Sequence, residues 1–418
     1  MDLATCLLLA LEACLAYFLL WRAGLLTTRR AYILSAMLTA AAFLLRAWCL
    51  PYETLDYQDF LSKWVAFYRD NLGFRSLSYP LGNYNIPYLY FLCFFSYLPI
   101  RDLFLIKLLS IFFDVVLAFA ASSLLALCGG GTRSRLCCFF AVLFLPTVVL
   151  NGALWGQCDS IYVSLALLGL WLALSDRPVL SVLCFALSFG FKLQAVFLLP
   201  VMAVLWFRGS CRLWHFALFP LFYIALVLPA VLLGKPFLET LTLYLSQADS
   251  VGSALNYNSP SIYAFFWRSP QTQDAANLGI VGAVTYMLSL LLVCFFRRRR
   301  LSPRAVVAAA FLFAAGIPFL LPHMHDRYFF GADVLSVVLG FGCLLCVPCA
   351  LLMQYASLLS YYAYFRMRFL LYVDHGARAV IAAIVLGFVR LLQETAAGGG
   401  HEFQKTENSA LTKPENLL

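Results

Sequence analysis

Long apolar runs, separated by short polar stretches, fill most of the chain. They have roughly the 15 to 25 residues that a helix needs to cross a hydrocarbon core of about 30 Å, and they predict about 11 membrane spans. We place these spans at 3–21, 31–49, 103–128, 136–150, 160–175, 178–191, 193–207, 213–233, 277–296, 305–321 and 330–352. The pattern predicts an all-α, polytopic transmembrane bundle.

The composition excludes several other classes of protein. The 418 residues are 63% hydrophobic and only 12% charged, whereas soluble domains have about 25% charged residues. The chain therefore cannot fold as a soluble globule, and it is too apolar to be disordered. Unbroken apolar runs also exclude a transmembrane β-barrel, whose strands alternate in hydrophobicity.

Basic residues in alternate loops predict the orientation of the bundle, because Lys and Arg concentrate on the cytoplasmic side. The net charge of +9 is spread between apolar runs, which indicates membrane orientation and no binding of nucleic acid. These loops contain Arg22, Arg29, Arg30, Arg133, Arg135, Arg177, Arg208, Arg212, Arg297, Arg298, Arg299, Arg300 and Arg304. The opposite, extracytoplasmic face then receives 50–102, 151–159, Lys192, 234–276 and 322–329.

We divide the chain into four regions. They are an additional N-terminal span and basic loop (1–30), the main transmembrane region (31–352), cytoplasmic interfacial helices or a further span (353–395), and a disordered, cytoplasmic tail (396–418). Glu12 lies inside the first apolar run, so we expect a retained span and not a signal peptide. In the first large outer loop, Phe60, Trp64 and Phe67 recur at helical spacing and predict an amphipathic surface helix.

Two carboxylates, Asp56 and Asp59, follow the second predicted span at the start of this amphipathic segment. Asp56 can simply cap the N-terminus of the helix. It can also act as a general base, because a carboxylate at a partly desolvated interface can take a proton from a bound hydroxyl group. Spacing alone does not separate the two roles.

A polar turn at 151–160 joins two predicted spans and contains Trp155, Gln157 and Asp159. Trp155 alone is typical of an interfacial anchor. The cluster of amide, carboxyl and hydroxyl groups exceeds what a turn requires. Beside an aromatic face, it suits the binding of sugar hydroxyls.

Lys192 and Gln194 lie between two very short spans. A lysine at membrane depth is costly and usually faces a cavity or a partner, although one near a span end can also extend to the interface. In the third span, Lys107 and Asp114 are two helical turns apart on one face. We expect these two to form a structural ion pair.

The loop at 322–328 carries His323, His325, Asp326 and Arg327 between apolar segments. Two histidines and an aspartate suggest a zinc site, but their spacing differs from the helical HExxH pattern and a fourth ligand is missing. We favour a phosphate site, with Arg327 as a planar cation and His325 as a second donor.

In order and spacing, these motifs resemble those of the GT-C superfamily of integral-membrane glycosyltransferases. The matching residues are Asp56-Tyr57-Gln58-Asp59-Phe60, Trp155-Gly156-Gln157-Cys158-Asp159-Ser160, Phe191-Lys192-Leu193-Gln194 with Pro200, and His325-Asp326-Arg327-Tyr328. The chain is similar to bacterial relatives of the second mannosyltransferase of GPI-anchor assembly and, more distantly, to the lipid-linked-oligosaccharide glucosyltransferases. Its additional N-terminal span departs from the family pattern.

The resemblance implies that 31–352 is the catalytic region of an inverting glycosyltransferase. It implies transfer of a hexose, with mannose expected, from a polyprenyl-phosphate donor to a lipid-linked or envelope glycan acceptor on the outer face. The implied catalytic residues are Asp56 as base and Asp59 in support, and the implied ligands of the donor phosphate are Lys192, His325 and Arg327. The residues expected to bind sugar or acceptor are Tyr57, Trp155, Gln157, Asp159 and Gln194. We expect membrane lipids as partners and no cofactor, with a divalent metal as the less favoured alternative.

A polytopic transporter or flippase of a lipid-linked glycan is the alternative from another class. Transporters usually gather their substrate groups near the membrane midplane, on broken helices. The polar clusters of this sequence lie at one predicted surface instead. A non-catalytic scaffold would have little reason to keep Asp56, Gln157, Lys192 and Arg327 together, so we expect an enzyme.

Overall fold

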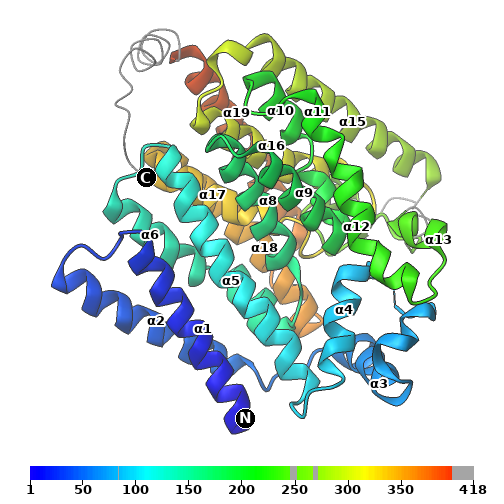
Figure 1. The fold of residues 1–418 in the computed structure, drawn as a ribbon. Helices are drawn as coiled ribbons and strands as arrows, with labels where there is room; N and C mark the ends of the chain where they lie inside the picture. The colour runs from blue at the N-terminus through cyan, green and yellow to red at the C-terminus, as the bar shows by residue number, and fades with distance from the viewer. Residues whose placement is uncertain (83, 245–251, 267–271, 398–418) are drawn as a thin grey trace.

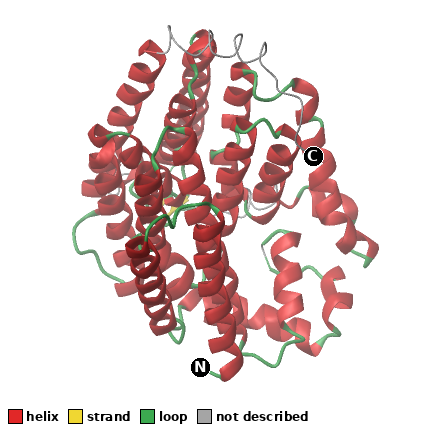
Figure 2. Cartoon of the chain, turned by 60° about the vertical axis from the view of Figure 1, so that its left-hand side comes forward, coloured by secondary structure: helices red, strands yellow, loops and turns green. Residues whose placement is uncertain are grey.

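The chain folds as an all-α bundle, which confirms the predicted fold class (Figure 1). A computed structural model describes residues 1–82, 84–244, 252–266 and 272–397. Within these residues, strand is confined to β1 (Asn256–Tyr257) and β2 (Met324–His325), which pair in parallel amid the helices (Figure 2). The predicted disordered tail lies outside the described residues from position 398 onward.

Among the described residues, eight helical segments are long and apolar enough to cross a membrane. They are α1 (Leu3–Arg22), α2 (Arg29–Cys49), α5 (Asp102–Leu127), α11 with α12 (Leu213–Leu232), α15 (Gln273–Phe296), α16 (Pro303–Leu320), η7 with α18 (Leu344–Arg366) and α19 (Val373–Ala397). A ninth span would join α6 (Thr132–Leu143) to Pro146–Trp155 across a 44° bend. Shorter apolar helices are α4 (Ile86–Phe95), α8 (Asp159–Leu174), α9 (Pro178–Phe191), η4 with α10 (Leu193–Arg208) and α17 (Phe330–Gly342).

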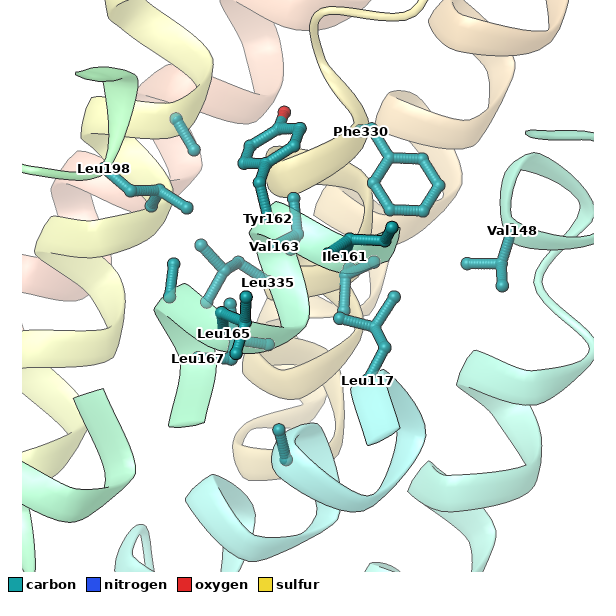
Figure 3. Packing of buried hydrophobic residues seen from close by; sticks show 14 of the residues in the cluster. Leu117, Val148, Ile161, Tyr162, Val163, Leu165, Leu167, Leu198, Phe330 and Leu335 are labelled. Atoms are coloured by element: carbon teal, nitrogen blue, oxygen red, sulfur yellow. The ribbon is translucent and has the colours of Figure 1, made fainter. Parts of the chain in front are cut away.

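The core of the bundle is built around α16, in which every residue from 305 to 319 is buried. Its sequence is apolar on all sides, as expected for a helix that is enclosed by protein. It packs against α15, α17 and α19, while α5 packs against α6, α8 and α17. Figure 3 shows part of this core, with Leu117 of α5, Ile161 of α8 and Phe330 of α17. By contrast, α1 and α15 expose most of their apolar surface, which suits contact with lipid.

The predicted span at 330–352 is wrong, because the chain breaks into two helices there. α17 ends at Gly342, Cys343 has an extended backbone, and α18 (Val347–Arg366) then turns back. Pro348 lies in the first turn of α18, a position that proline favours at the start of a helix. For 353–395 the sequence predicts either interfacial helices or a further span. This region forms most of α18 and α19, which are both long and apolar enough to cross a membrane.

The amphipathic segment of the first large loop is helical, as the spacing of its aromatic residues predicts. A π-helical turn, η1 (Tyr57–Leu61), leads into α3 (Ser62–Asp70). Trp64 is buried and Phe67 is partly buried, whereas Phe60 is exposed. α3 packs on α4, and the two helices lie together beyond one end of the bundle (Figure 1).

The predicted outer and inner loops gather at opposite ends of the bundle. At the basic end, Arg208 Nε donates to the carbonyl of Leu301, and Arg304 Nε donates to the carbonyl of Cys128. At the other end, the loop after α2 contacts the 151–159 turn, which in turn contacts Lys192 and Arg327. The positive-inside rule predicts that the basic end is cytoplasmic.

The predicted ion pair between Lys107 and Asp114 is wrong. Asp114 instead pairs with Arg46 of α2, whose Nη2 lies 2.9 Å from Asp114 Oδ2, and both side chains are fully buried. Ser160 Oγ also donates to Asp114. Lys107 Nζ donates to backbone carbonyls at the end of α2. Lys107 and Asp114 are two helical turns apart on α5, so each side chain has different neighbours. Asp114 pairs with a side chain of α2, and Lys107 binds carbonyls at the end of α2.

We predict that Asp114→Ala strongly destabilises the bundle, because the Arg46 guanidinium would stay buried without its counter-charge. Removing one partner of a buried ion pair costs about 3–5 kcal/mol. Thermal unfolding of the purified protein in detergent would show a much lower midpoint for Asp114→Ala than for the control Asp70→Ala, which changes an exposed residue.

In the double variant Arg46→Met with Asp114→Leu, we expect most of this stability to return, because apolar residues of similar volume replace the pair. A double variant as unstable as Asp114→Ala would mean that the ion pair is not the source of the loss.

Candidate active site

Asp56 lies just beyond the end of α2, against the 151–160 turn. Its Oδ2 accepts hydrogen bonds from Trp155 Nε1 at 2.9 Å and from Gln157 Nε2 at 2.7 Å. The carboxylate is half-buried. Although Asp56 precedes η1, its side chain makes no capping hydrogen bond to this helix. Two donors therefore orient the Asp56 carboxylate, which does not cap the helix that follows it.

Lys107 fixes the segment that leads to Asp56. Its Nζ donates to the carbonyls of Cys49 at 3.2 Å, Leu50 at 3.0 Å and Tyr52 at 2.5 Å. The last carbonyls of a helix lack hydrogen-bond partners within the helix. A cation at this end donates hydrogen bonds to them and interacts favourably with the negative end of the helix dipole. A fully buried lysine thus ties α5 to the end of α2 and sets where the acidic segment starts.

The 151–160 turn presents its side chains through an unusual backbone. A π-helical turn, η3 (Leu150–Trp155), ends at Gly156, whose φ is +79°. This left-handed conformation suits glycine, which has no Cβ to clash. The chain then reverses into α8, and Trp155 and Gln157 both reach Asp56 from the same short stretch.

Asp159, at the first position of α8, gathers two cations from distant segments. Lys192 Nζ forms an ion pair with its Oδ1, and Arg327 Nε lies 3.5 Å from its Oδ2. Asn151 Nδ2 also donates to Oδ2, at 2.7 Å. Asp159 is only 1% exposed. Such a buried carboxylate needs cations and hydrogen bonds to offset its loss of hydration.

The Trp155 indole joins the acidic and cationic groups into one site. Its Nε1 donates to Asp56, while the Arg327 guanidinium lies 5.3 Å from the centre of its ring. Asp56 and Arg327, 271 positions apart in the chain, therefore contact the same side chain. The fold thus brings these two motifs together at one end of the bundle.

Four buried polar atoms around this site have no hydrogen-bond partner within the described part of the chain. They are Asn151 Oδ1, Asp326 Oδ1, Arg327 Nε and the hydroxyl of Tyr364. Buried polar groups are usually hydrogen-bonded. Their position around the Asp159 cluster indicates a site that is completed by a polar ligand or by water.

Two neighbouring groups in the 322–328 loop have shifted pKa values. Burial, aided by Arg327 and Lys192, lowers the pKa of His325 to about 4, so its imidazole is neutral at pH 7. It can still donate one N–H, but it adds no positive charge. Burial raises the pKa of Asp326 to about 7, although the Arg327 guanidinium, whose Nη1 lies 3.7 Å away, opposes this shift.

Three of the sequence-predicted residues lie apart from the contacts just described. Asp59 is exposed and lies 3.9 Å from Lys63 Nζ. The Tyr57 hydroxyl donates to Asp102 Oδ1 at 3.1 Å, which ties the first loop to the start of α5. Gln194 is partly buried. The predicted residues that the structure does bring together are Asp56, Trp155, Gln157, Asp159, Lys192 and Arg327.

The aromatic residues that enclose this site were not predicted from the sequence. Tyr364 of α18 stacks on Trp155 with ring centres 3.8 Å apart, and the hydroxyl of Tyr361 accepts from Asn151. The Tyr84 hydroxyl donates to Gln157 Oε1 at 3.3 Å. The run Tyr361-Tyr362-Ala363-Tyr364-Phe365 was a visible signal, since tyrosines cluster where one side is apolar and the other polar.

Within the described residues, no group of three or more His, Cys, Asp and Glu side chains is arranged to hold a metal ion. His325 faces aromatic rings instead: it stacks on Tyr257 with centres 4.5 Å apart and an interplanar angle of 7°. Metal independence of the activity stays a prediction.

The sequence matches the profile of a known protein family. The sequence profile of glycosyltransferase family 87 matches residues 83–322, which is more than half of the chain. The matched region includes Trp155, Gln157, Asp159 and Lys192, but it begins after Asp56 and ends before Arg327. No curated protein matches the chain.

We predict that Lys107→Met loosens the segment between α2 and Asp56, because three carbonyls would lose their donor. Hydrogen exchange measured by mass spectrometry should show amides at 50–58 exchanging roughly 10- to 100-fold faster, as expected from the loss of one to three net hydrogen bonds. The control Lys63→Met removes an exposed ion pair and should leave these amides unchanged. Equal protection in Lys107→Met and in the wild type would show that the lysine does not hold this segment.

Proposed function

Because this chain belongs to glycosyltransferase family 87, we propose that it transfers a hexose from a polyprenyl-phosphate donor to a lipid-linked or envelope glycan acceptor, with inversion at the sugar. The resemblance to GPI mannosyltransferase relatives suggests mannose. One observation carries the proposal: a carboxylate, Asp56, and a cation, Arg327, both contact Trp155 at one end of a membrane bundle, where Lys192 joins Arg327 at Asp159.

Asp56 acts as the general base in this proposal. The acceptor hydroxyl oxygen attacks the anomeric carbon of the donor sugar, and Asp56 takes the proton of that hydroxyl as the new bond forms. The bond between the anomeric carbon and the phosphate oxygen breaks, and its electron pair leaves with the polyprenyl phosphate. The Trp155 and Gln157 donors hold one carboxylate oxygen in place and so orient the base.

Lys192 and Arg327 act on the leaving phosphate. Charge grows on the phosphate as it departs, and fixed cations in a poorly hydrated site stabilise that charge. Both cations now contact Asp159, which holds them in position and offsets their charge before the donor binds. The neutral His325 contributes an N–H donor and not a charge.

The location of the site at one end of the bundle fits a lipid-borne substrate. A polyprenyl-phosphate sugar keeps its tail in the bilayer and presents its sugar at the interface. Membership in a glycosyltransferase family also favours an enzyme over the transporter alternative.

We predict that Asp56→Asn lowers turnover by about 10²- to 10⁴-fold, the usual contribution of a general base. The assay would give the purified protein a panel of polyprenyl-phosphate sugars and measure release of the lipid phosphate. Asp59→Asn is a matched control, since this carboxylate is exposed and lies away from the site, and it should keep normal turnover.

Loss of activity in Asp59→Asn with normal activity in Asp56→Asn would contradict the assignment of the base. Release of lipid phosphate from none of the sugars in the panel would contradict the donor class.

We predict that the KM for the donor rises several-fold between pH 6 and pH 8. Because the pKa of Asp326 is raised to about 7, its carboxyl is neutral below this pH and leaves the full charge of Arg327 for the phosphate. Above pH 7 the carboxylate forms and competes with the phosphate for Arg327. Initial rates at several donor concentrations would measure the effect.

In Asp326→Asn this side chain stays neutral at every pH, so the donor KM should remain near its low-pH value across the range. The same rise in KM in the variant as in the wild type would show that another group titrates.

A further inference from the structure

A cavity lies beside the candidate active site. It has a volume of about 260 Å³ and is formed by the 254–264 segment and by the turn between α18 and α19. We call it the side pocket. Its lining includes Asn256, Asn258 and Tyr263 from the first segment, which we call the first wall, and Phe369, Tyr372 and Val373 from the second segment, which we call the second wall.

Each wall of the side pocket leads directly to the candidate active site. In the first wall, Tyr257 lies between the two asparagines and its ring stacks on His325. The second wall follows the end of α18, where Tyr364 stacks on Trp155. The segments that line the side pocket are therefore continuous with two side chains, Tyr257 and Tyr364, that contact the candidate active site.

The backbone is strained in the first wall and at His323, which is hydrogen-bonded to it. Asn258 and His323 have φ values of +57° and +61°, which usually cost about 1–3 kcal/mol for residues other than glycine. The strain is held by hydrogen bonds: His323 N and Nδ1 both contact carbonyls of the 254–255 segment at 2.8 Å. The Asn256 side chain also bonds to the backbone of Ser259 in both directions.

The side pocket combines amide groups with aromatic rings. Within the described chain, the Asn258 side chain has no hydrogen-bond partner. Phe369 and Tyr372 on the second wall have exposed rings. Amide groups beside aromatic surfaces are the groups that bind a sugar ring.

We infer that the side pocket binds the carbohydrate part of the acceptor, one sugar ring being set between the Asn258 amide and the Phe369 ring. Its volume is slightly below the roughly 300–1,000 Å³ of pockets for drug-sized ligands, which suits one ring and not an extended chain. The inference rests on the proposed function, because a glycosyltransferase needs a site for its second substrate. It assigns the donor phosphate to Lys192 and Arg327 and the acceptor sugar to a different set of residues.

The test uses the full chain in lipid nanodiscs with a panel of octyl glycosides of common hexoses as acceptor probes. Asn258→Gly removes the amide and keeps the positive φ, which glycine adopts freely, and Phe369→Ala removes the facing ring. In each variant we expect the KM for the glycoside, and its dissociation constant by calorimetry, to rise about tenfold, the effect of losing one net contact of ~1.4 kcal/mol. The donor KM should stay unchanged.

Matched controls lie away from the side pocket. Asn71→Gly changes an exposed asparagine at the end of α3, and Phe296→Ala changes an exposed phenylalanine at the end of α15. Both controls should keep wild-type constants for donor and glycoside. A similar loss of glycoside affinity in the controls would overturn the assignment.

The outcomes separate this inference from the proposed function. Transfer to a glycoside with an unchanged glycoside KM in both variants would leave the function standing and overturn the pocket. Saturable glycoside binding that Asn258→Gly weakens, without release of lipid phosphate from any donor, would support the pocket and contradict the proposed reaction. Failure of the wild type to bind any glycoside would overturn the inference.

Discussion

The burial of one carboxylate, Asp159, organises the functional end of this bundle. A carboxylate with 1% exposure is tolerable only when cations and hydrogen bonds replace its water. Here Lys192, after α9, and Arg327, before α17, supply that compensation. Because both cations come from breaks between helices, the ion pairs hold three separate chain segments together where the helices end, and they place two cations in a site that a phosphate can enter.

Trp155 connects this electrostatic cluster to the acidic segment. Its indole Nε1 donates a hydrogen bond to Asp56, and the guanidinium of Arg327 lies over its ring. Tyr364 stacks on the same indole. The sequence context of Trp155 is typical of an interfacial anchor, but the residue is 1% exposed and lies at the centre of the site. Asp56 stays half-buried on one side of the indole, which suits a base that must reach a substrate hydroxyl, while Lys107 and the Arg46–Asp114 pair fix the helices behind it.

The proposed sites of the two substrates are linked through one side chain. His325 lies two residues before Arg327 and stacks on Tyr257, which belongs to the segment that lines the side pocket. Its low pKa keeps it neutral, so it adds no charge beside the donor phosphate. The strained Asn258 and His323 backbones flank the two strands of the same short sheet, and strain of this kind is found where the surrounding structure fixes a functional geometry.

The sequence by itself determined the helices and the chemical inventory of the site. Apolar length and helical period are local properties, so spans such as 3–21 and 277–296 agree closely with α1 and α15, and the motifs at Asp56, Trp155, Lys192 and Arg327 were visible in order. Only the tertiary structure decided which side chains contact one another. It paired Asp114 with Arg46 and not with Lys107, left Asp59 exposed, broke 330–352 at Cys343 and brought Tyr364 onto Trp155. The reason is physical: the spacing of residues along a helix fixes which face a side chain occupies, but the group that compensates a buried charge or covers a ring depends on which helices pack beside it.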